Sequence, residues 1–209
     1  QKFPIFEGMR NLLLLFFAFI LFGCGPEPHN QPQNNSYTPC TNFIVNNDFY
    51  EVDDDTFLNM LNDALDVVSL TEREKQVKLK EYRGSAFTRI FVRKRCLYNE
   101  ENIIVHFDAL EPTRKLLEYM KSEMEMQQKS MMPQGFYSNI IESGMSKWKS
   151  ENRQFNYLYL ISENRYEDNH YYSNQYIIDI FGRYYHVIIN TQDNLKIEDV
   201  FLSVYTPFV

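Results

Sequence analysis

The sequence lacks the short motifs by which most common enzyme classes can be recognised. It contains no Gly-x-Ser-x-Gly turn, which would present a serine nucleophile, and no glycine-rich loop of the Walker or dinucleotide-binding type. The run Asp53-Asp54-Asp55 is without the glycine and the distal glutamate of a calcium-binding loop. We therefore expect no enzymatic activity and no cofactor.

Residues that could bind a metal ion are also few and scattered. No His-Glu-x-x-His motif or close histidine pair occurs among His29, His106, His170 and His186. Six methionines between Met120 and Met145 raise the question of copper(I), which prefers soft thioether ligands. Because Met120 and Met124 share a helical spacing with Leu116 and Leu117, core packing explains them better. The sequence predicts no metal site.

Glycine is scarce, with 7 residues in 209, whereas aromatic residues make up 16% of the chain. This composition is not typical of disordered proteins, and it favours a fold that contains β-strands. Residues 43–209 are numerous enough to form a single domain with its own hydrophobic core.

Long apolar runs are absent except at the N-terminus, where Leu12–Phe22 is uninterrupted by any polar residue. Arg10 precedes this run, and the small residue Gly23 follows it. Eleven helical residues would span only about 16 Å, roughly half of a bilayer core. The segment therefore has the features of an export signal rather than of a transmembrane helix.

The end of this signal, Leu21-Phe22-Gly23-Cys24, resembles the lipobox of bacterial lipoproteins. In that family the cysteine thiol receives a diacylglycerol, a signal peptidase cuts before the cysteine, and the new amine is often acylated. Phe22 departs from the family pattern, which usually has a smaller residue there. The resemblance implies that Cys24 is the site of lipid attachment and that residues 1–23 comprise upstream residues and a signal peptide.

The segment after Cys24 is rich in proline and asparagine, so we expect residues 24–42 to be a flexible tether between the lipid and a domain formed by residues 43–209. Gly25 is not the aspartate that retains enterobacterial lipoproteins at the inner membrane. The periplasmic face of an outer membrane is therefore the favoured location, with the cell surface as the alternative.

Cys40 and Cys96 are the only cysteines beyond the lipid site. In an oxidising compartment they could form a disulfide closing a 57-residue loop, which a loop-entropy argument values at about 4 kcal/mol. Two unpaired buried thiols are the alternative, because the sequence alone does not show that the two residues approach each other.

Hydrophobic spacing divides residues 43–209 into helices and strands. Helical spacing predicts helices that begin near Asp53, Thr71, Pro112 and Phe136. Alternation predicts strands at Phe43–Tyr50, Ser85–Cys96, Ile103–Asp108, Phe155–Ser162, Tyr171–Ile180, Tyr184–Asn190 and Leu195–Tyr205, the last with a β-bulge near Glu198 and Asp199. This order predicts an α+β fold with N-terminal helices packed on a curved antiparallel sheet. It resembles the cone-shaped nuclear-transport-factor-two-like and cystatin-like folds.

Charge is strongly segregated along the chain. Residues 24–70 contain eight acidic residues and no Lys or Arg, whereas residues 73–95 contain nine basic and two acidic residues. Strand alternation within the basic segment would place one set of side chains on a common face, consisting of Phe87, Arg89, Phe91, Arg93 and Arg95. Such a face could bind an anionic partner, or it could pack within the fold against the acidic helix near residues 53–66.

An exported protein whose net charge after cleavage is −8 is a poor candidate for nucleic-acid binding. The sequence favours a non-enzymatic binding or structural module for another envelope protein. An immunity-type inhibitor of a toxin is a second hypothesis. A pocket-bearing enzyme is a third, with His170, His186, Asp179 and nearby tyrosines as its candidate residues.

Overall fold

The computed structural model describes residues 42–53, 55, 56, 59, 62, 71–73, 75, 76, 88–94, 101–108, 110–130, 136–150, 153–166 and 169–205. The chain divides into two compact units. Residues 42–52 and 88–205 form the sheet unit, and residues 53–87 belong to the other unit together with both chain ends. The predicted lipid site Cys24 and the predicted disulfide partners Cys40 and Cys96 lie outside the described residues.

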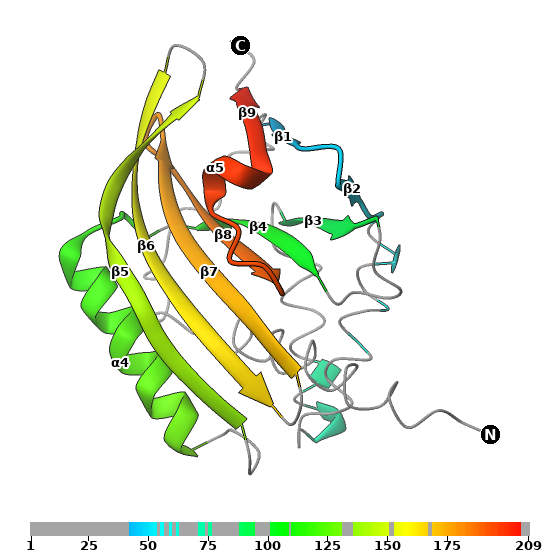
Figure 1. Cartoon of the computed structure of the whole chain (residues 1–209), viewed down its shortest axis with the longest axis vertical. Coiled ribbons are helices and arrows are strands. Elements are labelled where there is room, and N and C mark those ends of the chain that lie inside the picture. Colours follow the sequence, from blue (N-terminus) through cyan, green and yellow to red (C-terminus); the bar gives the residue numbers. More distant parts are fainter. Residues whose placement is uncertain are drawn as a thin grey trace. The chain divides into compact units, whose positions relative to one another are not determined.

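The sheet unit is built on seven antiparallel strands (Figure 1). Their spatial order is β2 (Phe49–Glu51), β3 (Thr88–Arg93), β4 (Asn102–Asp108), β8 (Arg183–Thr191), β7 (Asn169–Ile180), β6 (Arg153–Tyr166) and β5 (Phe136–Ser150). A two-stranded sheet pairs β1 (Asn42–Val45) with β9 (Phe201–Tyr205). Two helices are described in this unit, α4 (Arg114–Ser130) and the single turn α5 (Ile197–Val200).

The predicted α+β fold, with N-terminal helices packed on a curved antiparallel sheet, was wrong. The described structure is dominated by antiparallel strands, and its one long helix, α4, follows the first four strands. The cone-shaped nuclear-transport-factor-two-like or cystatin-like architecture is corrected with it. Two of the described segments have a different secondary structure from the predicted one, namely Phe136–Ser150 and Ile197–Val200.

The helix predicted from Phe136 onward is instead the 15-residue strand β5. The register of β5 against β6 shifts between Ile140 and Glu142, which is a β-bulge. A bulge inserts one residue and reverses the alternation of the residues that follow it. The apolar residues before and after the bulge therefore fit no single period of two, and their spacing resembles that of a helix.

The second failure concerns the segment predicted as the strand Leu195–Tyr205. Residues Ile197–Val200 form α5, and only Phe201–Tyr205 are a strand. The turn is closed locally, since the Lys196 N–H donates to Asp199 Oδ2 over 2.7 Å and the Asp199 N–H donates to the Lys196 carbonyl over 3.0 Å. The change of apolar parity is thus produced by one helical turn and not by a β-bulge.

The two faces of the seven-stranded sheet are covered by different elements. On the helix face, Leu158, Leu160 and Ile177 pack against Leu117 and Met124, so the apolar stripe predicted for α4 is confirmed. On the opposite face, Phe43 of β1 packs edge-on against Tyr185 of β8 and against Phe201 of β9. The predicted strands that correspond to β3 and β4 pair as antiparallel neighbours, as do those that correspond to β6, β7 and β8.

In the other unit, the described positions 55, 56, 59 and 62 are helical, as are 72, 73, 75 and 76. Asp53 Oδ1 accepts a hydrogen bond from the Thr56 N–H over 2.7 Å. This hydrogen bond is the largest of the effects that hold the pKa of Asp53 below its ordinary value. The contact is that of an N-terminal helix cap, which agrees with the helix start predicted at this acidic run.

Candidate functional site

Two arginines of the predicted basic strand face are engaged by carboxylates of the sheet unit. Arg89 donates through Nε to Glu51 Oε1 over 2.6 Å and through a second nitrogen to Glu51 Oε2. Its guanidinium also lies 5.1 Å from the ring centroid of Phe91, which is itself buried. Phe87 and Arg95, the outer members of the predicted face, lie outside the described residues.

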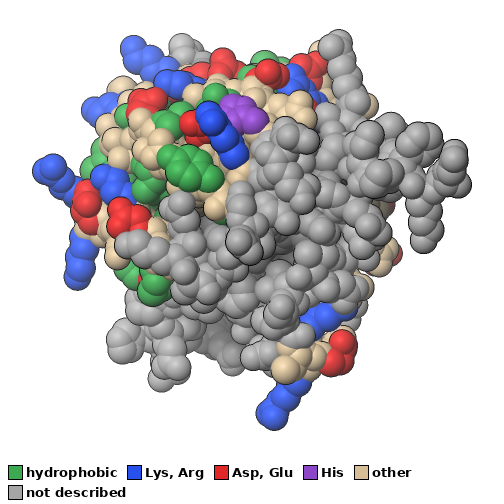
Figure 2. Space-filling view, turned by 60° about the horizontal axis from the view of Figure 1, so that its bottom comes forward, with side chains coloured by type: hydrophobic (Ala, Val, Ile, Leu, Met, Phe, Trp, Pro, Cys, Tyr) green, Lys and Arg blue, Asp and Glu red, His purple; other side chains and the backbone are tan. Residues whose placement is uncertain are grey.

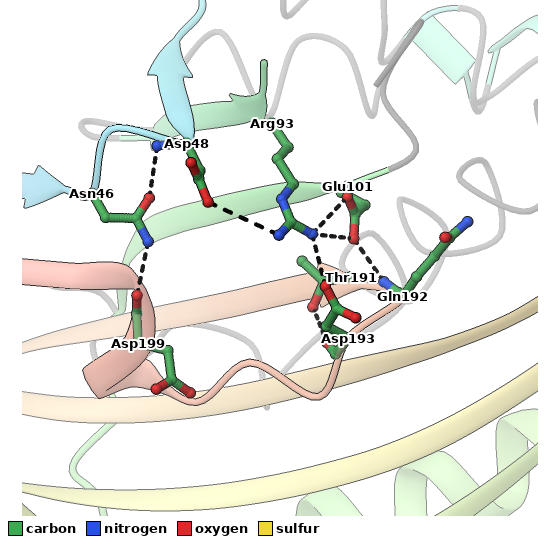
Figure 3. A network of polar contacts seen from close by, with 8 residues as sticks. All are labelled: Asn46, Asp48, Arg93, Glu101, Thr191, Gln192, Asp193 and Asp199. Atoms are coloured by element: carbon green, nitrogen blue, oxygen red, sulfur yellow. Dashed lines mark hydrogen bonds and ion pairs between the residues drawn. The ribbon is translucent and has the colours of Figure 1, made fainter. Parts of the chain in front are cut away.

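Arg93 is the centre of a larger network (Figure 3). One of its nitrogens donates to both oxygens of Glu101, over 2.8 and 2.9 Å, and to Asp193 Oδ2 over 3.2 Å. Asp48 approaches the other terminal nitrogen at 4.0 Å. Partial burial disfavours the charged form of Arg93, but these hydrogen bonds outweigh it and raise the pKa of Arg93.

The network joins segments that are far apart in the sequence. Glu101 also accepts the Gln192 N–H over 2.9 Å, and Asn46 donates to the Asp199 carbonyl over 2.8 Å (Figure 3). These contacts tie the β1–β2 turn, the end of β3 and the segment after β8 together. Arg89 and Arg93, the two arginines of this face that the structure describes, thus have intramolecular partners. The role of this face in binding an external partner stays a prediction.

The residues named for an enzymatic site are not brought together. His170 and His186 point to opposite faces of the sheet, because they differ in register parity along β7 and β8. Asp179 Oδ1 accepts the Gly182 N–H over 2.7 Å in the β7–β8 turn. His186 lies directly across from His106 of β4, and its Nε2 is 3.3 Å from Gln175 Oε1.

Two adjacent rows of neutral polar side chains lie on the helix face, and all of these side chains are buried. The first row comprises Asn102, Asn190, Ser173 and Ser162, and the second pairs Asn164 with Ser138. Asn190 Nδ2 donates to Asn102 Oδ1 over 2.9 Å, whereas Asn190 Oδ1 has no hydrogen-bond partner among the described residues. A slip of one residue would move these side chains to the other face, so they help to specify the strand register.

The strongest exposed candidate is a set of side chains at the common end of β5, β6 and β7, called here the tip cluster. Its members are Tyr137, Glu163, Arg165, His170 and Tyr172. Tyr137, Arg165 and His170 stand side by side across the three strands, and Glu163 pairs with Tyr172 in the next row. All five therefore project from the face opposite α4.

Glu163 organises the tip cluster. Its Oε1 accepts a hydrogen bond from Arg165 over 2.7 Å and lies 2.7 Å from His170 Nε2. The hydrogen bond from Arg165, followed by that from His170, lowers the pKa of Glu163 below its ordinary value. Glu163 in turn raises the pKa of Arg165. The His170 ring packs edge-on against Tyr172 at 5.0 Å, which fixes the imidazole from a second side.

The tip cluster is open to solvent although its members are held in place. The exposed fractions are 61% for the Arg165 side chain, 41% for His170 and 50% for Tyr137. The last pair between β7 and β8 is Tyr172 with Thr191, so Arg165 and His170 extend beyond β8. In the described part of the surface in Figure 2, a histidine lies beside basic, acidic and hydrophobic side chains.

Sequence reasoning named His170 and, without numbers, the tyrosines near it, but it missed Glu163, Arg165 and Tyr137. It ended one strand at Ser162 and began the next at Tyr171, whereas β6 continues to Tyr166 and β7 begins at Asn169. Extending the two strands by the alternation of Glu163 and Arg165 would have paired Arg165 with His170. The contribution of Tyr137 had no such signal, because it depends on recognising β5 as a strand.

Comparison of the chain with protein-family models and with curated proteins returns no match. Within the described segments, no helix combines the length and the apolar composition needed to span a bilayer. In the same segments, no three His, Cys, Asp or Glu side chains gather as a group that could hold a metal ion.

Proposed function

We propose that the protein is a lipid-anchored component of the bacterial cell envelope that acts by binding a protein partner through the tip cluster. The observation that carries the binding role is the solvent-exposed Arg165–Glu163–His170 arrangement flanked by Tyr137 and Tyr172. The membrane location is supported by the lipobox at Cys24 and by the proline- and asparagine-rich segment that follows it.

The composition of the tip cluster suits a protein interface. Tyrosine and arginine are enriched among residues that dominate binding energy, since they offer a large contact area together with directed hydrogen bonds. Arg165 uses one terminal nitrogen on Glu163, so further N–H donors of its guanidinium face outward. The partner that fits this chemistry presents a carboxylate beside apolar side chains, which can pack on the tyrosine rings.

Preorganisation adds to this argument. Glu163 holds both Arg165 and His170 before any partner arrives, so little side-chain entropy is lost on binding. In this proposal, a carboxylate of the partner meets Arg165 at the common end of β5, β6 and β7. No other described element of the sheet unit covers the face there.

The test begins with the mature protein as bait in detergent-solubilised envelopes, followed by measurement of the affinity of the recovered partner. We expect Arg165→Ala and Tyr137→Ala each to weaken binding by about tenfold or more, as removal of a central interface residue does. Tyr50→Ala is the matched control, because Tyr50 is exposed to nearly the same extent as Tyr137, 48% against 50%. It should change the affinity by less than about twofold.

Equal affinities for Arg165→Ala, Tyr137→Ala and the unmodified protein would contradict the assignment of the tip cluster. The identity of the partner has its own consequence. Tight one-to-one binding to a single toxin would make the protein an immunity-type inhibitor, whereas a resident envelope protein would make it a structural or recruiting module.

A further inference from the structure

The end of the sheet unit opposite the tip cluster carries an unusual turn. β7 and β8 are joined by Phe181 and Gly182, both with positive φ angles of 55° and 76°. Glycine adopts this conformation freely, but a bulky side chain such as phenylalanine is disfavoured in it. Strained residues that are retained in a structure often mark a functional position.

Phe181 is 63% exposed, although a polar residue would suit a turn in this conformation better. Arg153 lies over its ring at 5.3 Å, and Phe155 packs against its edge at 5.7 Å. The ring is therefore held in a fixed position with much of its apolar surface facing solvent.

Four basic side chains lie at the same end of the sheet as this ring, and together with it they are called here the Phe181 end. Arg153 shares the face of Phe155, whereas Lys147 and Lys149 pair with Asn156 and Gln154 and project from the face that α4 covers. The set comprises Lys147, Lys149, Arg153, Phe181 and Arg183. Lys147 and Lys149 are exposed near the end of β5, and Arg183 begins β8. None of these three forms an ion pair with a described residue, so their charge is available to an anionic partner.

A chain of aromatic rings connects Phe181 to the point where the chain enters the sheet unit. Phe155 contacts Trp148, Trp148 contacts Phe201, and Phe201 contacts Phe43 of β1. The tether predicted for residues 24–42 leads directly into β1, and a flexible chain of that length spans about 24 Å on average. Successive ring contacts therefore link Phe181 to β1, the strand that directly follows the predicted tether.

We infer that the Phe181 end contacts the lipid surface to which the protein is anchored. The Phe181 ring would enter the interface between head groups and acyl chains, and the cations on both faces of this end would attract anionic head groups. This inference rests on the proposed lipid anchor. It also gives the sheet unit an orientation, with the Phe181 end toward the membrane and the tip cluster away from it. Arg153 and Arg165 mark these two ends on β6 and are about 40 Å apart along an extended strand.

Tryptophan fluorescence with brominated phospholipids tests this contact. The protein has one tryptophan, Trp148, and its side chain is buried, so the unmodified protein supplies the background. The mature full chain carrying Phe181→Trp is combined with vesicles that contain phosphatidylglycerol. We expect brominated lipid to quench the added fluorescence of this variant. Tyr137→Trp at the tip cluster is the control and should show no added quenching.

A second pair of variants tests the role of charge and guards against misfolding. Lys147→Glu with Lys149→Glu, in the Phe181→Trp background, should reduce quenching on phosphatidylglycerol vesicles to the level seen on phosphatidylcholine alone. Phe181→Asn suits the left-handed turn and should fold normally while lowering the fraction of protein that sediments with vesicles when Cys24 is also replaced by serine.

Absence of quenching for Phe181→Trp, or equal quenching at both ends, would overturn the inference. Binding of the Phe181 end to an acidic protein in place of lipid would give that first result in pure lipid vesicles. Mass spectrometry of Cys24 in the same samples tests the anchor separately. A missing lipid adduct contradicts the anchor, while the quenching measurement with added vesicles still decides whether this end contacts lipid.

Discussion

At the scale of residues, Arg93 shows how a charged side chain inside a strand can be stabilised by acids from distant segments. Its main partner Glu101 is buried, with 6% of its side chain exposed, so removal of Arg93 would take away the cation to which both oxygens of this carboxylate are hydrogen-bonded. We expect Arg93→Ala to lower the free energy of unfolding by about 2 kcal/mol. Chemical denaturation monitored by the fluorescence of Trp148 would measure the loss.

Lys121→Ala provides the comparison for this measurement. Lys121 pairs with Glu118 over 3.1 Å on the surface of α4, where 62% of the Glu118 side chain is exposed. Such pairs contribute little, so a loss below about 0.5 kcal/mol is expected. Equal losses for the two variants would show that the Arg93 network has no special structural role.

Glu163 gives a prediction about pH. Its pKa is lowered in the folded protein, chiefly by Arg165. The charged form of Glu163 therefore stabilises the fold at pH values above the ordinary pKa of 4.5. This contribution must disappear as the pH falls through the lowered pKa, because the protonated carboxyl no longer favours the folded state. We expect Glu163→Gln to be less stable than the unmodified protein at pH 7 and to approach it under acid conditions.

Thermal unfolding as a function of pH would check this expectation. Glu125→Gln is a suitable control, because Glu125 is exposed on α4 and forms no ion pair with a described residue. A difference between Glu163→Gln and the unmodified protein that stays constant from pH 7 to pH 3 would contradict the coupling of Glu163 to Arg165 and His170.

At the scale of elements, β5 depends on close packing between Gly144 and the ring of Tyr159. A Cβ atom at position 144 would lie 2.9 Å from Tyr159 Oη and 3.1 Å from Cζ. The ring can yield only by weakening the hydrogen bond from Tyr159 to Glu142. We expect Gly144→Ala to destabilise the protein by about 1–2 kcal/mol, as overpacking does.

A double-mutant cycle isolates this contact. In the background of Tyr159→Ala the space above position 144 is vacant, so Gly144→Ala should cause no further loss there. If the two losses were additive, the contact with Tyr159 could not be the cause, and a backbone effect at Gly144 would have to be sought.

The elements that sequence reasoning predicted correctly are those whose pattern is local and regular. Ile90 and Val92 alternate within β3, and Leu117 and Met124 follow helical spacing in α4; all four are buried. β5 failed because its bulge mixes two alternations, and α5 failed because its turn depends on the contact between Asp199 and the Lys196 N–H. Neither the bulge nor the turn is marked by a distinctive amino-acid composition in its segment.

The candidate site was less predictable than the fold. The tip cluster depends on which residues of β5, β6 and β7 stand opposite each other, and the pairing of β5 with β6 had no signature in the sequence. The acids that surround Arg93 come from positions 48, 101 and 193. One of the two hypotheses drawn from the sequence placed an acidic counterpart for the basic strand in a different segment, near residues 53–66.

At the scale of the whole molecule, the central prediction concerns the anchor. We expect the unmodified protein to partition into the detergent phase and to incorporate labelled fatty acid, because the resemblance at Cys24 implies lipid attachment. Cys24→Ser should abolish both properties while leaving the sheet unit folded. Circular dichroism would confirm the fold, and fatty-acid labelling that persists in Cys24→Ser would contradict the assignment.

The position of β5 at the margin of the described sheet has a consequence for crowding. A long outer strand with free backbone groups is a template on which a second molecule can polymerise, and proteins confined to a surface meet one another often. The bulge after Ile140 interrupts the straight hydrogen-bonding edge, and Lys147 and Lys149 place like charges along it. In the proposed lipid-anchored state, we therefore expect neighbouring copies to pack densely without joining into fibrils.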